Sequence, residues 1–493
     1  MMSSNTGEKK RKIGTDETSD YITYMSGTVI DVYKGRGQRI PKDVISVRFH
    51  PSVIEIEEKA FMDCISLKEV VFNEGLKKIG QKVFENCNSL QSITLPSTLT
   101  EIGNMAFRYC NNLKRVELNE GLEKIGRHSF YQCKIEGSIN FPSSLVEIGA
   151  SSFEDNVHLT DVVLNDGLSK IKSGAFSGCK TLKSITLPST IIKVDDCAFQ
   201  HCSELRQVVF NEGLKKIGID SFQGCQRLKR IILPTTVTHI GKGSFCCSVL
   251  SSLEEVVLNE GLQMIGGGAF ERCYSLRSIT IPSSITEISN DVFTGCTNLR
   301  DIVLNGRVKV IGDSVFNNCA SLQSIKLPHI KVIGGSAFKG CRWLREVGLN
   351  EEIQEIGMDA FEGCIRLQRF ALPHLSMRLE AIMQDSRWEE IRNKIDNTYG
   401  VQRQGSELFI ERTIFESAQW KDRIDNLIAH ISYPEMKAAT TLFELALWKA
   451  KIDQRLETNR SKCRVDVPGP IKDVILQYLW PKLAITHTLW RNE

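Results

Sequence analysis

The sequence lacks both a long hydrophobic run and a clear excess of charge of one sign. Its 493 residues include 62 basic and 59 acidic side chains, so the formal net charge is only +3. A chain this close to neutrality has no strong positive field, which argues against binding to nucleic acid or to an anionic membrane. No stretch of about eighteen apolar residues, the length that a membrane-spanning helix needs, occurs in the chain. We therefore expect neither a nucleic-acid partner nor a membrane partner.

A secretory signal is also missing from the N-terminal residues. Residues 1–20 are polar and contain no hydrophobic segment, so we expect a disordered tail and a cytoplasmic protein. The alternative is a nuclear protein, because Lys9, Lys10, Arg11 and Lys12 form a short basic cluster like those of nuclear localisation signals. Such clusters are also common on solvated tails.

Motifs that carry catalysis are absent as well. The nine histidines are scattered, no His-Glu-x-x-His is present, and no serine or cysteine lies near a histidine and a carboxylate at a recognisable spacing. Residues 241–244 (Gly-Lys-Gly-Ser) resemble the end of a phosphate-binding loop, but the upstream glycine of that motif is missing. The sequence therefore predicts a protein that is not an enzyme and has no cofactor, metal or small-molecule substrate.

The chain does contain a long internal repeat. A phenylalanine recurs every 23 residues, apart from one spacing of 25 and one of 22. A fixed period of this size is typical of a solenoid, in which each unit buries its apolar face only against its neighbours. The fourteen copies are Phe61, Phe84, Phe107, Phe130, Phe153, Phe176, Phe199, Phe222, Phe245, Phe270, Phe293, Phe316, Phe338 and Phe361.

Each repeat is expected to form one coil of the solenoid. At the end of the first apolar segment, Val116 and Leu118 alternate with Glu117, so the two apolar side chains should point inward and the carboxylate outward. A tight turn follows, then a second apolar pair such as Leu122 and Ile125, and then a short helical turn that carries the repeat phenylalanine. Stacked coils of this kind make a curved array with a parallel β-sheet, whose concave face is the usual binding surface.

Two kinds of turn alternate along the array. Asn-Glu-Gly or Asn-Asp-Gly turns, such as residues 119–121, alternate with turns that begin with proline, such as Pro96. Both are turn chemistries, because glycine permits positive φ and proline restricts φ. The alternation creates 46-residue double units and predicts one rim with acidic and neutral turns in sequence.

Most of the sixteen cysteines follow the repeat rather than a metal motif. Twelve lie three residues after a repeat phenylalanine, once per coil and never in Cys-x-x-Cys pairs, which argues against zinc. A small thiol suits a buried turn, so we expect a structural ladder. The role of Cys197, Cys246, Cys247 and Cys463 stays open. The ladder cysteines are Cys64, Cys87, Cys110, Cys133, Cys179, Cys202, Cys225, Cys273, Cys296, Cys319, Cys341 and Cys364.

Three coils depart from the pattern. Asn156 and Ser248 stand where the ladder cysteine is expected, and Glu136 stands where a leucine is expected. We expect the neighbouring Ile135 to fill that leucine pocket. The two extra residues around 246–252 should bulge from the stack.

The chain outside the array has a different composition. We predict a disordered tail at residues 1–20, an N-terminal cap at 21–43, fourteen repeats at 44–375 and a small all-α domain at 376–493. Five of the six tryptophans lie in this last region. Helix-like apolar spacing is found at 379–395, at 408–431 and from Pro434 onward. Whether these helices cap the last coil or recruit a partner is open.

The repeat resembles the BspA-type leucine-rich repeats of bacteria and protists. The residues that carry the likeness are Ile102, Gly103, Phe107, Cys110 and Leu113, with equivalents in fourteen copies over residues 44–373. The flanking residues 47–53 and 441–451 are similar to those of large families of algal protists. The resemblance implies a curved, non-catalytic leucine-rich-repeat array. Several bacterial members are secreted adhesins, so a cell-surface or adhesion role is an alternative.

The outward side chains of the predicted strands are the candidate binding site. We expect the protein to be an intracellular scaffold that binds a protein partner of unknown identity through the concave face of the sheet. The simpler interpretation is that β-branched residues are merely good strand formers. Recruitment through the C-terminal region is a further alternative. The candidate site residues are Val163, Thr186, Val209, Ile232, Val257, Thr280 and Val303, flanked by Arg230 and Glu255.

Overall fold

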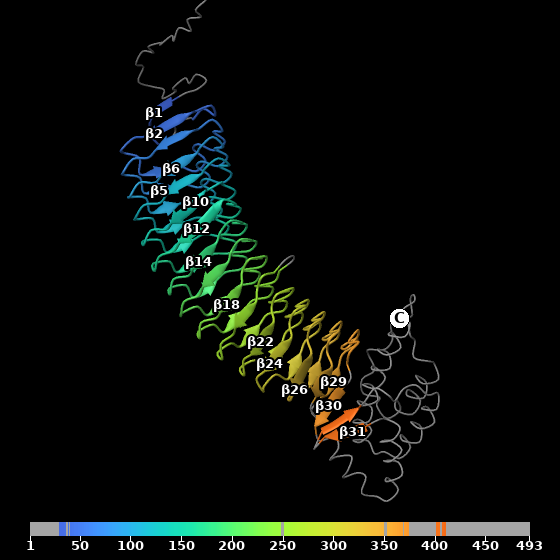
Figure 1. Cartoon of the computed structure of the whole chain (residues 1–493). Coiled ribbons are helices and arrows are strands. Elements are labelled where there is room, and N and C mark those ends of the chain that lie inside the picture. The colour runs from blue at the N-terminus through green and yellow to red at the C-terminus, as the bar shows by residue number, and fades with distance from the viewer. Residues whose placement is uncertain are drawn as a thin grey trace, which may run out of the picture. The chain divides into compact units, whose positions relative to one another are not determined.

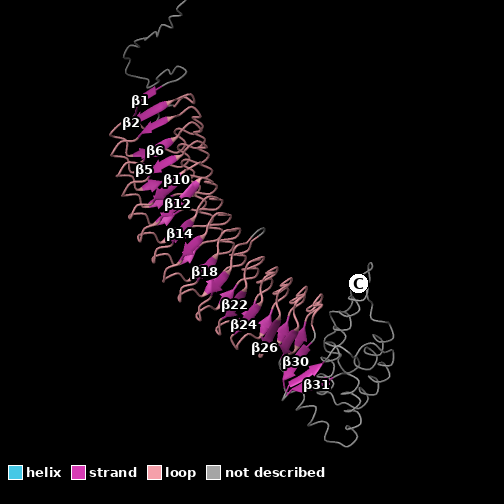
Figure 2. Cartoon of the chain, in the orientation of Figure 1, coloured by secondary structure: helices cyan, strands magenta, loops and turns pink. Residues whose placement is uncertain are grey.

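The described residues form short strands joined by tight turns, stacked coil on coil within each unit (Figure 1). The computed structural model describes residues 29–35, 38, 40–247, 251–349, 353–367, 369–373, 401–404 and 407–410. Within these ranges there are strands and turns but no α-helix (Figure 2). The chain divides into two compact units, Met1–Ser203 and Glu204–Glu493. We describe each unit by itself.

The first unit contains two series of strands, one longer and one shorter, and each coil contributes one strand to both. Within each series the neighbouring strands that pair are parallel. The long strands are β1 (Val29–Tyr33), β2 (Ser46–Phe49), β4 (Glu69–Val71), β6 (Ser92–Thr94), β8 (Arg115–Glu117), β10 (Gly137–Asn140), β12 (Leu159–Val163) and β14 (Ser184–Thr186). The short strands are β3 (Glu55–Ile56), β5 (Lys78–Ile79), β7 (Glu101–Ile102), β9 (Lys124–Ile125), β11 (Glu147–Ile148), β13 (Lys170–Ile171) and β15 (Lys193–Val194).

The second unit is also built from a longer and a shorter series of strands. Its long strands are β16 (Gln207–Val209), β18 (Arg230–Ile232), β20 (Glu255–Val257), β22 (Ser278–Ile281), β24 (Asp301–Leu304), β26 (Ser324–Leu327), β28 (Glu346–Leu349) and β30 (Arg369–Pro373). Its short strands are β17 (Lys216–Ile217), β19 (His239–Ile240), β21 (Met264–Ile265), β23 (Glu287–Ile288), β25 (Val310–Ile311), β27 (Val332–Ile333) and β29 (Glu355–Ile356). The pairing is again parallel between coils. This confirms the predicted solenoid of stacked coils.

The repeat period sets the register between coils. In β6 and β8 the paired residues are 23 apart, for example Ser92 with Arg115 and Ile93 with Val116. A slip of one residue would turn every buried side chain to the solvent, so the period and the core enforce each other. Val116 and Leu118 are half-buried and Glu117 is exposed, which agrees with the predicted inward and outward directions.

A column of stacked phenylalanine rings forms the centre of each unit. In the first unit neighbouring rings have centroids 5.1–5.5 Å apart, and in the second unit 5.2–5.8 Å apart. The rings are nearly parallel, as for Phe293 and Phe316, which differ by 2°. All fourteen repeat phenylalanines are buried, so these large apolar side chains dominate the core.

The turn that carries the phenylalanine is not helical, so the predicted helical turn is wrong. His128 and Gln132, which flank Phe130 at two residues on either side, both have φ of 53°. Left-handed residues at this spacing end any right-handed helix. The turn is closed instead by hydrogen bonds between residues three apart, such as that from the Cys133 amide to the Phe130 carbonyl at 3.4 Å.

The amides of this turn are used to bind the next coil, which is why a helix does not form. The Phe130 amide donates to the Ser152 carbonyl at 2.7 Å, and the Gln132 amide donates to the Glu154 carbonyl at 2.9 Å. In a helix these donors would be satisfied four residues earlier in the same coil. The same direction of donation, from one coil to the next, recurs at Phe61, Phe84 and Phe107 in the first unit.

The glycine of the Ile-Gly pairs permits the close stacking of backbones. A Cβ added at Gly103 would lie 2.6 Å from the carbonyl carbon of Gly80 in the preceding coil. A side chain at Gly103 would push the two backbones apart unless they shifted, so glycine favours the close approach. The position is not restricted to glycine in every coil, since Lys172, Asp195 and Ser289 occupy it elsewhere in the array. These glycines are thus structural, as are those of residues 241–244.

The N-terminal cap covers the first coil. β1 pairs with β2, and the buried Tyr33 ring lies 5.1 Å from Phe49 and 5.2 Å from Phe61. Burial raises the pKa of Tyr33 to about 12. Within the predicted cap at 21–43 the chain thus forms a strand at Val29–Tyr33, and the residues before it lie outside the described part of the chain.

The described part of the C-terminal region differs from the prediction. β32 (Glu407–Ile410) pairs antiparallel with β30 and with β31 (Val401–Gln404). The sequence favoured a helix from residue 408, because apolar spacing alone does not distinguish a helix from a short strand. The other residues of 374–493, with the helices predicted there, lie outside the described residues.

Phe293→Ala should destabilise the array by about 3–5 kcal/mol, because it removes a ring that stacks on both neighbours and leaves a cavity. Urea unfolding of the full chain, followed by circular dichroism, measures this. The exposed Thr280→Ala is the control and should change stability by less than about 0.5 kcal/mol. Equal effects of the two substitutions would contradict the assignment of inward and outward positions.

Candidate functional site

The predicted binding residues all lie on the solvent side of the long strands. In the first unit Val163 is 49% exposed on β12, and Thr186 is exposed on β14. The inward neighbours Val162 and Ile185 are buried. The two candidate positions of this unit therefore point outward, as the alternation predicts.

In the second unit five candidates form one row across successive long strands, which we call the outer row. It consists of Val209, Ile232, Val257, Thr280 and Val303. Val209 is 36%, Ile232 48%, Val257 40% and Val303 51% exposed. Ile232 pairs with Val257, and Thr280 pairs with Val303, in adjacent strands. The row is mainly apolar, and strand pairing holds the backbone in register within the pairs β18–β20 and β22–β24.

The charged flank of the outer row is internally paired. Arg230 Nε lies 2.9 Å from Glu255 Oε2, and a second guanidinium nitrogen donates to Glu255 Oε1 at 3.1 Å. Both side chains are more than half exposed, so the ion pair adds little stability. It orders two long side chains beside Ile232 and Val257.

The rim turns show an arrangement that sequence reasoning missed. The Ser143 hydroxyl donates to Glu120 Oε2 at 2.8 Å, and the Ser143 amide donates to the same carboxylate at 3.1 Å. These donors lower the pKa of Glu120. The acidic turn of one coil thus caps the neutral turn of the next, which explains the 46-residue double unit. The same contact joins Glu74 with Ser97, Glu212 with Thr235 and Glu260 with Ser283. The contact could have been found from the sequence, because the acidic residue of one turn and the hydroxyl residue of the next are 23 residues apart, which is one repeat period.

The ladder cysteines donate hydrogen bonds inside the core. Cys110 Sγ lies 3.1 Å from the Phe84 carbonyl oxygen, and Cys133 Sγ lies 3.2 Å from that of Phe107. Asn156, which replaces a cysteine, makes the same contact through its amide nitrogen, at 2.8 Å from the Phe130 carbonyl. The position therefore requires a buried donor, not a thiol as such.

Burial makes the ladder thiols poor nucleophiles and poor metal ligands. It raises the pKa of Cys110 well above its usual range and that of Cys64 to about 11. The off-ladder Cys246 behaves in the same way, with a pKa raised to about 12. The thiolate is the reactive form, so these groups are inert at neutral pH. Within the residues that the structure describes, no group of three or more His, Cys, Asp or Glu side chains could hold a metal ion.

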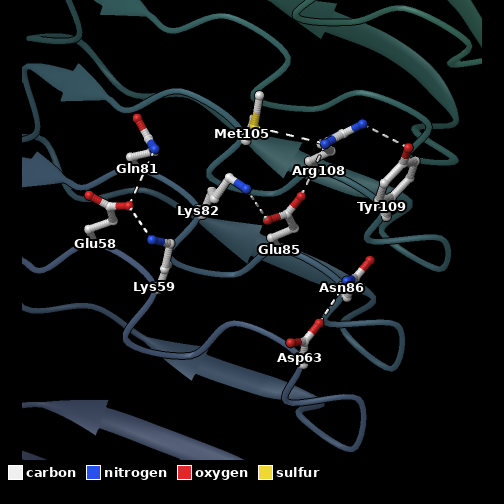
Figure 3. Close-up of polar contacts among 10 residues, drawn as sticks. All are labelled: Glu58, Lys59, Asp63, Gln81, Lys82, Glu85, Asn86, Met105, Arg108 and Tyr109. Atoms are coloured by element: carbon white, nitrogen blue, oxygen red, sulfur yellow. Dashed lines mark hydrogen bonds and ion pairs between the residues drawn. The ribbon is translucent and has the colours of Figure 1, made fainter.

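A network of polar side chains joins three coils of the first unit (Figure 3). Glu85 is 4% exposed and lies 3.4 Å from Lys82 Nζ and 3.3 Å from Arg108 Nη1. Arg108 also donates to the Tyr109 hydroxyl at 2.8 Å and lies over the Tyr131 ring. The network contains no nucleophile that is paired with a base, so it links coils rather than catalysing a reaction.

Two other predictions from the sequence are resolved by local contacts. Ile135 is 1% exposed and fills the leucine pocket, as expected. Glu136 is exposed and pairs with Lys114 at 2.9 Å. Ser244 of the phosphate-loop-like segment is buried and its hydroxyl donates to the Gly241 carbonyl at 2.9 Å, so it does not face a ligand.

Among the described residues no helix is long and apolar enough to cross a bilayer. Residues 248–250 lie outside the described part.

The ladder thiols should make the array sensitive to alkaline pH. Their raised pKa values keep them protonated in the folded state, whereas in the unfolded chain they ionise near the ordinary value of 9.0. Stability should therefore be complete below pH 9 and fall as the pH rises toward the folded-state pKa, by about 1.4 kcal/mol per pH unit for each thiol.

Urea unfolding under reducing conditions between about pH 8 and about pH 10 tests this. Lysines also titrate in this range, so the matched variant Cys110→Asn, chosen after Asn156, is compared with the unchanged chain. Above pH 9 the free energy of unfolding of the variant should fall by about 1.4 kcal/mol per pH unit less than that of the unchanged chain. The same slope in both proteins would contradict the account.

Comparisons with known proteins agree with this architecture. The family described as BspA type leucine rich repeat region (6 copies) matches residues 42–160, 146–253, 248–368 and 311–384. A leucine-rich repeat protein from Bacteroides ovatus is 30% identical, with 69% of this chain and 82% of that chain covered and a TM-score of 0.56.

Two less similar structures were also found. A leucine rich cell surface protein from Faecalibacterium prausnitzii is 23% identical, with 73% and 94% of the two chains covered and a TM-score of 0.43. The pneumococcal vaccine antigen PcpA is 20% identical, with 67% and 83% covered and a TM-score of 0.40. No curated protein matches significantly. From the family match and the Bacteroides relative, the chain belongs to the BspA-type leucine-rich repeat family.

Proposed function

We propose that this protein is a non-catalytic scaffold that binds a protein partner through the outward face of its long strands. The observation that carries the proposal is the outer row, which presents four exposed branched apolar side chains and one threonine on successive strands of the second unit. Soluble proteins rarely expose contiguous apolar surface without a binding role. The fold of the family, a repeat scaffold, fits this function.

The backbone under the outer row is ordered before any partner arrives. Ile231 and Val256, the inward neighbours of Ile232 and Val257, are buried, and their strands are paired in register. Branched side chains have few rotamers to lose on binding. A surface of this kind costs little conformational entropy when it is covered, which favours affinity for a partner.

The proposal includes three finer statements. The long-strand face is concave, as in curved repeat arrays. The protein acts inside the cell, in the cytoplasm or, through Lys9 to Lys12, in the nucleus. Its flanking residues 47–53 and 441–451 relate it to families of algal protists. The alternative, a surface or adhesion protein, would be favoured if cell fractionation found the protein exposed to added protease on intact cells.

Val209→Arg combined with Val257→Arg should abolish binding to the partner, because two long charged side chains would replace the first and the middle member of the apolar row. We expect the amount of partner recovered by affinity purification from the native cell to fall by about tenfold or more. Circular dichroism should show that the full chain stays folded, since both positions are exposed.

Met264→Arg is the matched control. Met264 is 46% exposed in the same unit, but it lies on the short strand β21. The Met264→Arg variant should therefore recover as much partner as the unchanged protein. Undiminished recovery with the double variant would show that the outer row is not the site.

A further inference from the structure

One exposed position just before each long strand is basic through much of the second unit. From N to C terminus it holds Arg206, Lys229, Glu254, Arg277, Arg300, Gln323 and Arg345, all exposed. The Arg300 amide donates to the Arg277 carbonyl at 2.8 Å, so these two arginines are direct neighbours in adjacent coils. We call Arg277, Arg300 and Arg345 the basic strip.

Within the described residues, the basic strip has no partner that neutralises its charge. Other arginines of this unit are paired, such as Arg206 and Arg227 with Glu204, each at 3.5 Å. Among the described residues, no carboxylate lies within 4.0 Å of a guanidinium nitrogen of the basic strip, although Asp301 and Glu346 follow two of its members in sequence.

Folding does not require this arrangement. Like charges on neighbouring strands are destabilising, and Gln323 shows that an uncharged side chain is accommodated at the same position. The basic strip therefore carries an unfavourable repulsion that an anionic partner would relieve.

An exposed tryptophan lies at the end of the basic strip. Trp343 is 43% exposed, two residues before Arg345, and the guanidinium carbon of Arg366 lies 3.5 Å from its ring centroid. Ile365, next to Arg366, is 41% exposed. Tryptophan and arginine are the residues most often found at the energetic centres of protein interfaces. The stacking fixes both side chains in place and leaves the guanidinium edge able to donate hydrogen bonds.

Two members of the basic strip lie on the same coils as members of the outer row. Arg277 precedes Thr280 by three residues and Arg300 precedes Val303 by three, with the exposed Ser278 and Asp301 between them, so each of these coils carries an exposed cation and a position of the row within four residues. Guanidinium groups match carboxylates in bidentate pairs, and the branched side chains match apolar ones. Nucleic acid would use the cations but not the apolar row, and the chain as a whole has a net charge of only +3.

We propose that the basic strip, with Trp343 and the adjoining outer row, binds an acidic segment of a protein partner that also carries apolar side chains. Its carboxylates contact Arg277, Arg300 and Arg345, and its apolar side chains contact Val257, Val303 and Trp343. This inference rests on the proposed function, because it gives the chemistry of the partner for the same face.

The test is a selection of random peptides of about fifteen residues, displayed on phage, against the full-length protein. Peptides rich in Asp and Glu together with apolar residues should be enriched. Arg277→Glu combined with Arg300→Glu should weaken the selected peptides by about tenfold or more, and so should added salt. The control is Lys183→Glu, the exposed residue at the same repeat position before β14 in the first unit, which should leave binding unchanged.

Each other result would overturn the inference in a distinguishable way. Apolar peptides without acidic residues that are lost with Val209→Arg and Val257→Arg would retain the proposed face but exclude an acidic partner. Two results would reject both the acidic partner and the proposed binding face. One is the enrichment of peptides whose binding is insensitive to all four substitutions, and the other is no enrichment at all. If the protein binds single-stranded RNA and loses this binding when Arg277→Glu is combined with Arg300→Glu, the basic strip binds nucleic acid instead.

Discussion

Each coil of this protein depends on the next one for the hydrogen bonds of its phenylalanine turn. The amide of Phe107 donates to the Ser129 carbonyl at 2.7 Å, and the left-handed residues Met105 and Tyr109 on either side of it turn the amides outward from their own coil. The contact is kept even in the coils of unusual length, since the Phe245 amide donates to the Ala269 carbonyl at 2.9 Å and the Phe316 amide to the Ala337 carbonyl at 2.7 Å. The phenylalanine turns therefore stay in register, and an extra or missing residue is accommodated elsewhere in the coil. The aromatic stack, the buried thiols and the paired rim turns all follow from that register.

The first coil shows what happens where no preceding coil is available. The Met62 carbonyl occupies the position that in later coils accepts an amide from the coil before, and here it accepts a hydrogen bond from the Lys42 ammonium. Cys64 likewise turns to the Pro41 carbonyl, at 3.7 Å. The N-terminal segment is therefore a cap in the chemical sense, since it supplies donors and acceptors that a coil would otherwise provide, and it covers the aromatic stack with Tyr33.

The period, the buried side chains and the outward candidate residues could all be predicted from the sequence, because each depends on a pattern within one coil. The phenylalanine turn could not, because Phe130 and Cys133 have the spacing of a helix whether or not the chain forms one. Contacts between coils were also missed. Glu120 with Ser143, and Trp343 with Arg366, are each 23 residues apart, so only a comparison of columns across coils brings them together. The outer row and the basic strip are such columns as well, so they too become visible only when equivalent positions of successive coils are compared.

Native-state hydrogen exchange of the full chain tests the central claim that the coils are joined through their phenylalanine turns. If the amides of Phe107 and Phe130 bind the next coil, peptides that contain these turns should exchange as slowly as those that contain β6 and β8, although they have no regular secondary structure. Exchange of the turn peptides at the rate of unstructured loops, with the strands still protected, would show that the strands alone hold the array together.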